Sequence, residues 1–199
     1  MNFPSINFSS DIVLGNNLVQ LRPFSPKDLE QLKSLAFDEN IWHYMTNRIS
    51  NMEELDTWGK AAVQDRQQQK RYTFVVVDKT TGKLAGSTSY GNISVRDSRL
   101  EIGWTWLGRS YQGSGLNRQC KFLLLQYAFE VLQFERVELK TDVLNTRSRK
   151  AILKIGATEE GVLRNHTLMQ DGRRRDTIYY SILKPEWETL KLTVFKDLL

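Results

Sequence analysis

The chain has very little cysteine, with Cys120 alone among its 199 residues. One thiol excludes an internal disulfide and a four-cysteine zinc site, and Cys120 falls at helical spacing that predicts a small buried side chain. The two histidines, His43 and His166, lack the spacing of metal ligands, so we expect no metal. No apolar run approaches the ~20 residues that span a bilayer. Residues 1–17 have no basic cluster before an apolar run, so we expect no signal peptide and a cytoplasmic protein without a membrane partner.

The most familiar nucleotide-binding patterns are also absent. The sequence contains no Gly-x-x-x-x-Gly-Lys-Ser/Thr, which argues against a P-loop. Its main glycine-rich stretch, residues 109–117, lies past mid-chain and does not fit Gly-x-Gly-x-x-Gly, which argues against a dinucleotide fold. No repeat, low-complexity segment or Pro/Gly-rich linker divides the chain. We therefore predict a single domain over residues 1–199, a length at which folding buries roughly 70% of the unfolded surface.

What is present begins with charge. The net charge of +5 favours anionic partners, such as a phosphate group or an RNA surface, without distinguishing them. A basic run, Arg173-Arg174-Arg175, follows the turn signal Asp171-Gly172, and we expect it to be a solvated hairpin tip. No RNA-binding signature is present. The hypothesis of an RNA-associated protein is therefore supported by net charge alone, and nucleic acid is not the expected partner.

Hydrophobic periodicity predicts alternating strands and helices. A helix starts at Ser25-Pro26, since serine caps helices and proline suits the first helical position. The remaining helices are predicted at 52–70, 116–132 and 148–155, and the strands at 18–21, 72–77, 84–90, 100–107, 137–143, 162–170 and 177–183. This order is typical of a mixed α/β sheet. Because the crossover over 116–132 is long, its two flanking strands should be parallel.

The most informative stretch is the glycine loop between the strand at 100–107 and the helix that follows it. Gly113 and Gly115 let the backbone approach an anion without an intervening Cβ. A loop in this position leaves free N–H groups at a helix N-terminus, where they can bind phosphate. An ordinary strand-to-helix turn would also use these glycines, so the pair alone does not decide between the two.

With its surroundings, this loop resembles the acyl-CoA-binding motif of the GNAT acetyltransferases, Gln/Arg-x-x-Gly-x-Gly/Ala. Gln112, Gly115 and Asn117 fall on the pattern, although Asn117 stands where Gly or Ala is usual. The similarity covers about residues 15–187 and is greatest to the branch that includes the Rim-type ribosomal-protein N-acetyltransferases. It continues through residues 126–130, 136–142, 145–148, 156–157, 160–164 and 172–177.

The resemblance implies a fold and an activity. The implied fold is the GNAT fold, a mixed α/β arrangement with a mostly antiparallel sheet of about seven strands and flanking helices. The implied activity is direct transfer of an acetyl group from acetyl-CoA to an amine, either a protein N-terminus or a small amine. A non-catalytic acyl-CoA-binding module on the same fold is the alternative, and a homodimer is left open. The residues implied to bind acetyl-CoA are Leu107, Arg109, Gln112, Gly113, Ser114, Gly115, Leu116, Asn117 and Asn145.

Glu101 is the candidate general base, because GNAT enzymes often place a glutamate on the strand before the glycine loop. A salt-bridged strand glutamate is the structural alternative. Asp142 and Glu138 are weaker rivals, since strand alternation could place either on an outer face. An α-amine with a pKa of about 8 is roughly a tenth neutral at pH 7, whereas a lysine amine at about 10.4 needs far more help. A single carboxylate therefore suits an N-terminal acceptor better.

Asn145 and Ser148 are the next candidate pair. The Rim-type branch has Asn-x-x-Ser here, near the thioester and pantetheine, so Ser148 could hydrogen-bond the leaving thiolate. Many other GNAT enzymes place a tyrosine four residues before the glycine that ends this helix, where this chain has Ile152. A helix N-cap explains both polar residues structurally, and the two roles are compatible.

The acceptor-side candidates are aromatic. Trp42 and Tyr44 lie where related enzymes place acceptor-side helices, and Trp104 lies on the strand before the glycine loop. Aromatic residues on strands more often form core, so packing is the alternative for Trp104.

Overall fold

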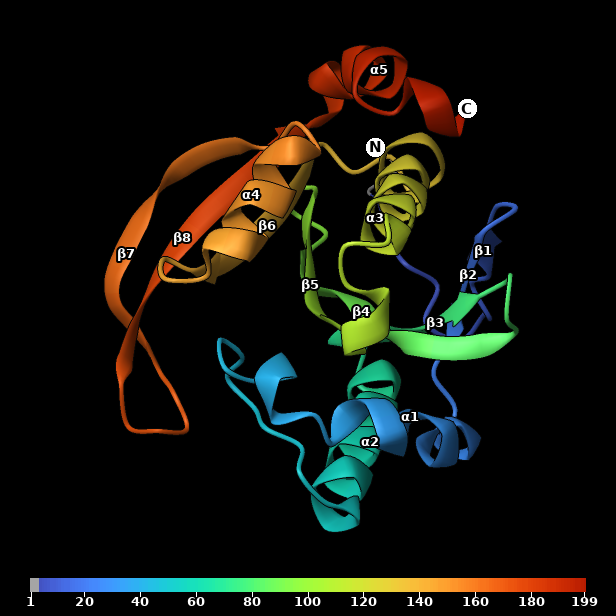
Figure 1. The fold of residues 1–199 in the computed structure, drawn as a ribbon. Helices are drawn as coiled ribbons and strands as arrows, with labels where there is room; N and C mark the ends of the chain where they lie inside the picture. Colours follow the sequence, from blue (N-terminus) through green and yellow to red (C-terminus); the bar gives the residue numbers. More distant parts are fainter. Residues whose placement is uncertain (1–3) are drawn as a thin grey trace.

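All eight strands found in residues 4–199, the part of the chain that the computed structural model describes, lie in one sheet (Figure 1). Their order is β1-β2-β3-β4-β5-β6-β8-β7. The strands are β1 (Leu14–Gly15), β2 (Val19–Pro23), β3 (Arg71–Asp78), β4 (Lys83–Ser94), β5 (Arg99–Leu107), β6 (Arg136–Asp142), β7 (Thr158–Leu168) and β8 (Arg174–Leu183). The helices are α1 (Leu29–Ala36), α2 (Met52–Gln67), α3 (Leu116–Gln126), α4 (Thr146–Lys154) and α5 (Lys184–Thr193).

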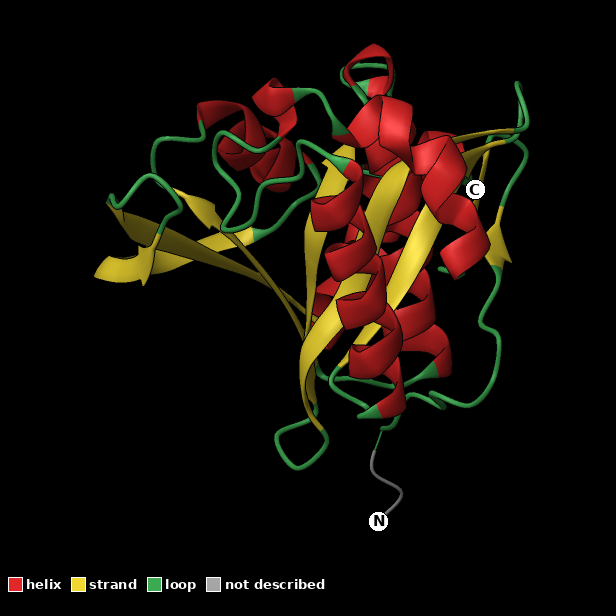
Figure 2. Ribbon diagram, turned by 90° about the horizontal axis from the view of Figure 1, so that it is seen from below, coloured by secondary structure: helices red, strands yellow, loops and turns green. Residues whose placement is uncertain are grey.

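Helices cover both faces of this sheet, so its central strands are buried on two sides. Figure 2, seen from the side of α1 and α2, shows helices in front of the strands and behind them. One apolar cluster lies under α3, α4 and α5 and includes Tyr90, Leu124 and Trp187. A second lies under α1 and α2 and includes Trp42 and Trp106. The sheet therefore separates two cores.

The sheet splits between β5 and β6. These two strands are parallel, as the long crossover through α3 predicted, but they pair only at Arg99–Glu101 with Arg136–Glu138. Every other neighbouring pair in the sheet is antiparallel. Beyond Glu101 the strands separate, and the facing edges of their carboxyl-terminal halves make no ladder with each other. A site between these halves is open to a ligand that brings its own hydrogen-bonding groups.

A bulge in β5 accompanies the split. Ser87 pairs with Trp106 and Ser89 with Gly103, so β5 has one more residue than β4 over this interval. Trp104 lies inside the bulge with φ +50°, a left-handed conformation that is rare for a bulky residue. Its ring covers Gly91, where a Cβ would meet the ring at 2.4 Å. The bulge therefore redirects the strand end that leads into the glycine loop.

Most predicted elements are present, with differences at their ends. Ser25 caps a 3₁₀ turn that leads into α1, as predicted. The regular part of α3 ends at Gln126, and a π-helical turn, Tyr127–Val131, follows where the prediction continued one helix to residue 132. The two-residue β1 and all of α5 were not predicted. The strand count is therefore eight rather than about seven.

Candidate active site

The glycine loop joins β5 to α3 through a 3₁₀ turn, Arg109–Tyr111. Gly113 and Gly115 have φ values of +79° and +88°, which only glycine adopts without strain. A Cβ added to either would meet no atom within 4 Å, so both face open space. Packing therefore does not require these glycines. The positive φ values require glycine at both positions, and the open space beside them leaves room for a ligand.

The amides of this loop lack protein partners. Within residues 4–199, the backbone N–H groups of Gly113, Ser114, Gly115 and Asn117 donate to no protein acceptor, and that of Leu116 has a long 3.3 Å contact to the Ser114 hydroxyl. They gather at the N-terminus of an eleven-residue helix, whose dipole favours negative charge. Free amides, an open approach and a helix N-terminus together make a site that fits a phosphate group.

The sequence-predicted loop residues contribute in different ways. Leu107 and Leu116 are buried and can offer only backbone groups, whereas Arg109 and Ser114 are exposed. Asn117 carries a buried side-chain oxygen without a hydrogen-bond partner in the described chain. A polar atom buried in this way is costly unless a ligand or water satisfies it. Asn117, which stands where the glycine-loop pattern usually has Gly or Ala, therefore has a buried side-chain oxygen that a ligand or water can satisfy.

Gln112 connects the glycine loop to α4. Its Nε2 donates to the Leu107 carbonyl at 3.0 Å, and its Oε1 accepts from the Arg147 guanidinium. Arg147 lies in the first turn of α4, beside Asn145 and Ser148. The structure therefore brings together two segments, the loop and the start of α4, that the sequence predicted separately. Arg147 itself was not predicted.

The start of α4 has the capping arrangement that the sequence suggested. Asn145 is the N-cap, and its Oδ1 accepts from the Ser148 amide at 3.0 Å. In the described residues the half-buried Ser148 hydroxyl has no hydrogen-bond partner, so it remains available to a ligand. Ile152, at the position where the resemblance would place a tyrosine, is buried in the core at 7% exposure. It offers no proton donor here.

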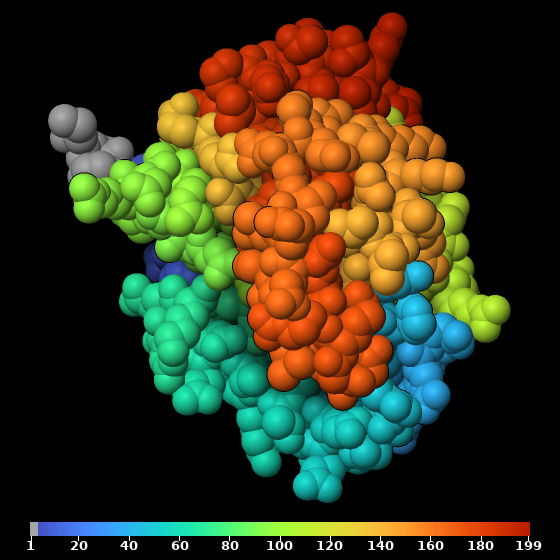
Figure 3. Space-filling view, turned by 90° about the vertical axis from the view of Figure 1, so that its left-hand side faces the viewer, coloured from blue at the N-terminus to red at the C-terminus, as the bar shows by residue number. Residues whose placement is uncertain are grey.

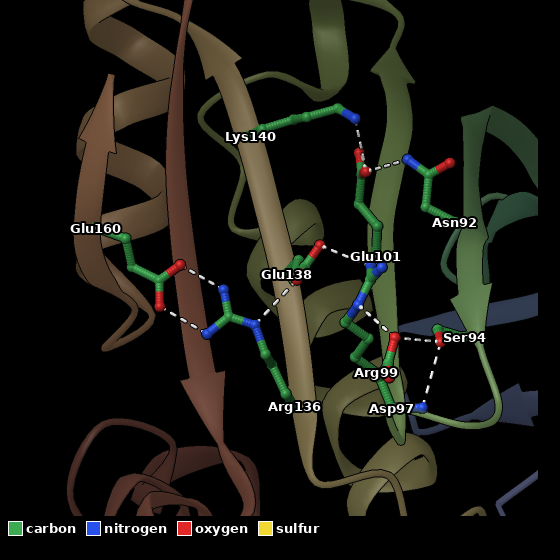
Figure 4. Close-up of polar contacts among 9 residues, drawn as sticks. All are labelled: Asn92, Ser94, Asp97, Arg99, Glu101, Arg136, Glu138, Lys140 and Glu160. Carbon is green, nitrogen blue, oxygen red and sulfur yellow. Dashed lines mark hydrogen bonds and ion pairs between the residues drawn. The ribbon is translucent and has the colours of Figure 1, made fainter. Parts of the chain in front are cut away.

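Glu101 stands where β5 and β6 begin to separate. It is 3% exposed, accepts a 2.6 Å hydrogen bond from the Asn92 amide and forms a 2.8 Å ion pair with Lys140 (Figure 4). Glu101 therefore forms the salt bridge expected of a structural strand glutamate. It also lies at the split, where a general base would act. Neither partner was predicted, because Asn92 comes from β4 and Lys140 from β6, and strand register is not visible in a sequence.

The two rival carboxylates have structural partners. Glu138 accepts from Arg136 at 2.9 Å and also faces Arg99 at 3.5 Å (Figure 4). Asp142 is fully buried, pairs with Arg173 and accepts the Leu144 amide at 2.9 Å. Asp142 therefore orders the turn between β6 and α4.

The basic run is not the solvated tip that the sequence predicted. Arg173 reaches back to Asp142, and Arg175 is 8% exposed. Only Arg174 is exposed, and it binds the side chain and carbonyl of Asn165. The prediction was wrong for Arg175, which is buried, and Arg173 is half-buried because it reaches back to Asp142 at the end of β6.

Of the three acceptor-side aromatics Trp42, Tyr44 and Trp104, only Trp42 lines the hollow between residues 39–48 and 169–171. Trp42 is 4% exposed, donates to the Ala36 carbonyl at 2.6 Å and packs against Trp106 at 5.3 Å, so most of its ring belongs to the core. Tyr44 is half-buried, with the His43 ring against it at 4.5 Å. In Figure 3 the hairpin of β7 and β8 descends over residues near position 40. The hollow there has about 430 Å³ and is lined by Glu39, Asn40, Trp42, His43, Met45, Arg48, Met169, Gln170 and Asp171.

A larger hollow of about 700 Å³ lies elsewhere, between the N-terminal segment, β2 and α2. None of its lining residues belongs to the glycine loop, the split or α4. The smaller hollow includes one sequence-predicted residue, Trp42, and likewise none from the glycine loop, the split or α4. Neither hollow by itself therefore locates the site.

A buried lysine was also missed. Lys121, on α3, is 6% exposed and donates to the Thr105 hydroxyl of β5 at 2.8 Å. Burial lowers its pKa to about 8, against the opposing influence of Cys120 and Glu101. Cys120 is 1% exposed, as expected of a small core residue, and burial raises its pKa to about 12.

Among residues 4–199, no helix has both the length and the apolar character needed to cross a membrane. The same part of the chain holds no group of three or more His, Cys, Asp or Glu side chains placed to bind a metal ion.

Comparison with known proteins gives consistent results. The model of the family described as "Acetyltransferase (GNAT) domain" matches residues 19–158. "Putative ribosomal N-acetyltransferase YdaF" of Bacillus subtilis is 31% identical over 87% of this chain and 95% of that protein. "Spermidine N(1)-acetyltransferase" of Escherichia coli is 25% identical over 85% of this chain and 88% of that protein. A solved GCN5-related N-acetyltransferase from Brucella melitensis superposes with a TM-score of 0.87 at 26% identity, covering 96% of this chain and 86% of that one.

Proposed function

The chain belongs to the GNAT acetyltransferase family, and we propose that it transfers an acetyl group from acetyl-CoA directly to an amine. The family and fold inferred from the motifs are confirmed, and the chain is an acyltransferase of this family. The co-substrate, the acceptor and the roles of individual residues are part of the proposal. So is the single domain over residues 1–199.

The free amides of the glycine loop are the observation that carries the proposal. Gly113, Ser114, Gly115 and Asn117 present N–H groups at the start of α3 that have no acceptor within residues 4–199, a site that suits the diphosphate of CoA. From there the separated edges of β5 and β6 offer backbone groups to the amides of a pantetheine arm. Asn145 and Ser148 lie across the split, held to the loop through Arg147 and Gln112.

Direct transfer requires a neutral amine and a stabilised thiolate. We assign removal of the amine proton to Glu101, directly or through water, because its buried carboxylate lies at the split. Lys140 and Asn92 hold that carboxylate in place from two other strands. We assign the thiolate to the Ser148 hydroxyl, which has no other partner in the described chain. A thiol with a pKa near 8.5 needs only a hydrogen bond to leave.

We propose a protein N-terminal α-amine as the acceptor, with a small amine as the second candidate. The name of the Bacillus relative supports the first, and the name of the Escherichia coli relative supports the second. The pKa argument favours the α-amine, because one carboxylate suffices for a group that is partly neutral at pH 7.

A glycine substitution tests the cofactor site. Acetyl-CoA should raise the melting temperature of the wild type by binding the native state, and Gly115→Asp should abolish that shift by placing a carboxylate against the diphosphate. Gly82→Asp is the matched control, since Gly82 also has positive φ and open surroundings but lies in the turn between β3 and β4. An undiminished shift in folded Gly115→Asp would refute the loop assignment.

Release of free CoA with a panel of peptides, polyamines and aminoglycosides tests turnover. If acetyl-CoA binds but no acceptor releases CoA, the non-catalytic alternative replaces the proposed transfer.

A further inference from the structure

Arg175 has a largely buried side chain that forms no ion pair with any acidic group in residues 4–199. It lies on β8 at 8% exposure, and its Nε donates to the Thr177 hydroxyl at 3.0 Å. In residues 4–199 it forms no ion pair, and its two terminal nitrogens donate to no protein acceptor. Its neighbours differ, because Arg173 pairs with Asp142 and Arg174 binds Asn165. Since an arginine stays charged in proteins, its burial has a cost in free energy that a ligand would offset.

Strand register places Arg175 on the polar face of the split. Ile178, Tyr180 and Ile182 point into the core beneath α3, so the alternate residues of β8 face the other way. Thr177 lies opposite Asp142, and Tyr179 lies opposite Lys140.

Arg175 shares this face with Thr177, because it lies two residues earlier on the same strand. Thr177 is held in turn by a 3.1 Å contact with His166. The face also holds Lys140, the ion-pair partner of Glu101. The guanidinium therefore lies on the side of the sheet where an acceptor would meet Glu101.

The charges on this face leave one cation uncompensated. Lys140 is paired with Glu101, and Arg173 is paired with Asp142. Neither carboxylate forms an ion pair with Arg175. Burial lowers the pKa of Arg175, while Asp142 and Glu101 oppose that change from a greater distance. In residues 4–199 Arg175 is therefore the cation of this face without a paired carboxylate, and its terminal nitrogens keep contact with solvent, where a ligand can reach them.

We propose that Arg175 binds a carboxylate of the acceptor, so that the preferred acceptor is an amine that also carries a carboxylic acid. This inference rests on the proposed transfer to an amine. Two terminal N–H donors in one plane match the two oxygens of a carboxylate. A phosphate dianion would need a second free cation, and the nearby Lys140 and Arg173 are already paired. The carboxylate comes from an acidic first residue of a peptide or from a free amino acid.

Matched acceptors test the charge requirement. Peptides that begin with Asp are compared with peptides that begin with Asn, and free amino acids with their amides, by release of CoA from acetyl-CoA. We expect kcat/KM of the wild type to be roughly 10- to 100-fold higher for the acid member of at least one pair, because the acid forms a charge-assisted hydrogen bond that the amide lacks. Which pair shows the preference identifies the source of the carboxylate.

Variants connect the preference to this side chain. Arg175→Met should remove the preference, mainly by raising KM for the acid member, while acetyl-CoA still raises the melting temperature. Arg174→Met, which removes an exposed neighbouring guanidinium, should keep the wild-type preference. If Arg175→Met does not fold, the wild-type comparison of acid and amide still tests whether the preferred acceptor carries a carboxylate.

The outcomes separate this inference from the proposed function. Equal kcat/KM within every acid–amide pair, or a preference that persists in Arg175→Met, overturns the role of Arg175 and leaves acetyl transfer standing. A wild type that releases CoA with no amine of any class overturns both.

Discussion

Lys121 offers a quantitative test of the buried polar region beside the site. Its ε-amino group is 6% exposed and hydrogen-bonded to Thr105, and burial lowers its pKa from 10.5 to about 8. The unfolded chain therefore binds more protons than the native one between these pH values. The charged lysine destabilises the fold fully below about pH 8, and the penalty disappears as pH rises above 10.5.

The size of this penalty follows from the two pKa values. The difference of 2.5 units from 10.5 to about 8 corresponds to about 3 kcal/mol at neutral pH. Lys121→Met keeps the length of the side chain and removes the charge. It also loses the hydrogen bond to Thr105, at a cost of about 1 kcal/mol, although Thr105 keeps its 2.8 Å contact with Thr88. We expect Lys121→Met to raise the free energy of unfolding by about 2 kcal/mol at pH 7.

Urea denaturation at pH 7 and pH 9.5 measures this effect. The lysine penalty should fall to roughly half by pH 9.5, so the gain of Lys121→Met should shrink accordingly. Lys150→Met is the control, because Lys150 is an exposed helical lysine of α4 and its replacement should change stability little at either pH. A gain that is absent at pH 7, or equal at both pH values, would refute burial as the cause of the lowered pKa.

Two further predictions concern the assigned catalytic groups. Glu101→Gln should lower turnover roughly 100-fold near pH 7 and less at pH 9, where more of the amine is neutral without help, while the Kd for acetyl-CoA stays nearly the same. An equal loss at every pH would mean that Glu101 serves to position Lys140 rather than to accept a proton. Ser148→Ala should lower turnover roughly ten-fold, about 1.4 kcal/mol, without weakening acetyl-CoA binding. Full activity in Ser148→Ala, judged beside an exposed control such as Ser110→Ala, would show that water or backbone meets the thiolate.

Local features of this protein were predictable from its sequence. The position of the glycine loop, the Asn145 cap of α4 and the Ser25 cap before α1 depend on the conformation of a few neighbouring residues. The parallel pairing of β5 with β6 followed from the length of the crossover between them. The family resemblance worked for the same reason, because its motifs are short segments whose order and spacing are visible in the chain. Helix α5 was missed, since its apolar residues become informative only once Trp187 packs against Phe122 and Phe129.

Contacts between distant segments were decided only by the tertiary structure. Glu101 was a sequence candidate, but its partners Asn92 and Lys140 come from other strands. The same holds for Gln112 with Arg147, and for Arg173, which the sequence suggested was solvated and which instead binds Asp142. These pairings depend on strand register, on the bulge in β5 and on the pairing of β8 with β6. The chain sets the propensities of its segments locally, whereas the burial of Arg175 and the partners of each carboxylate arise only when those segments pack.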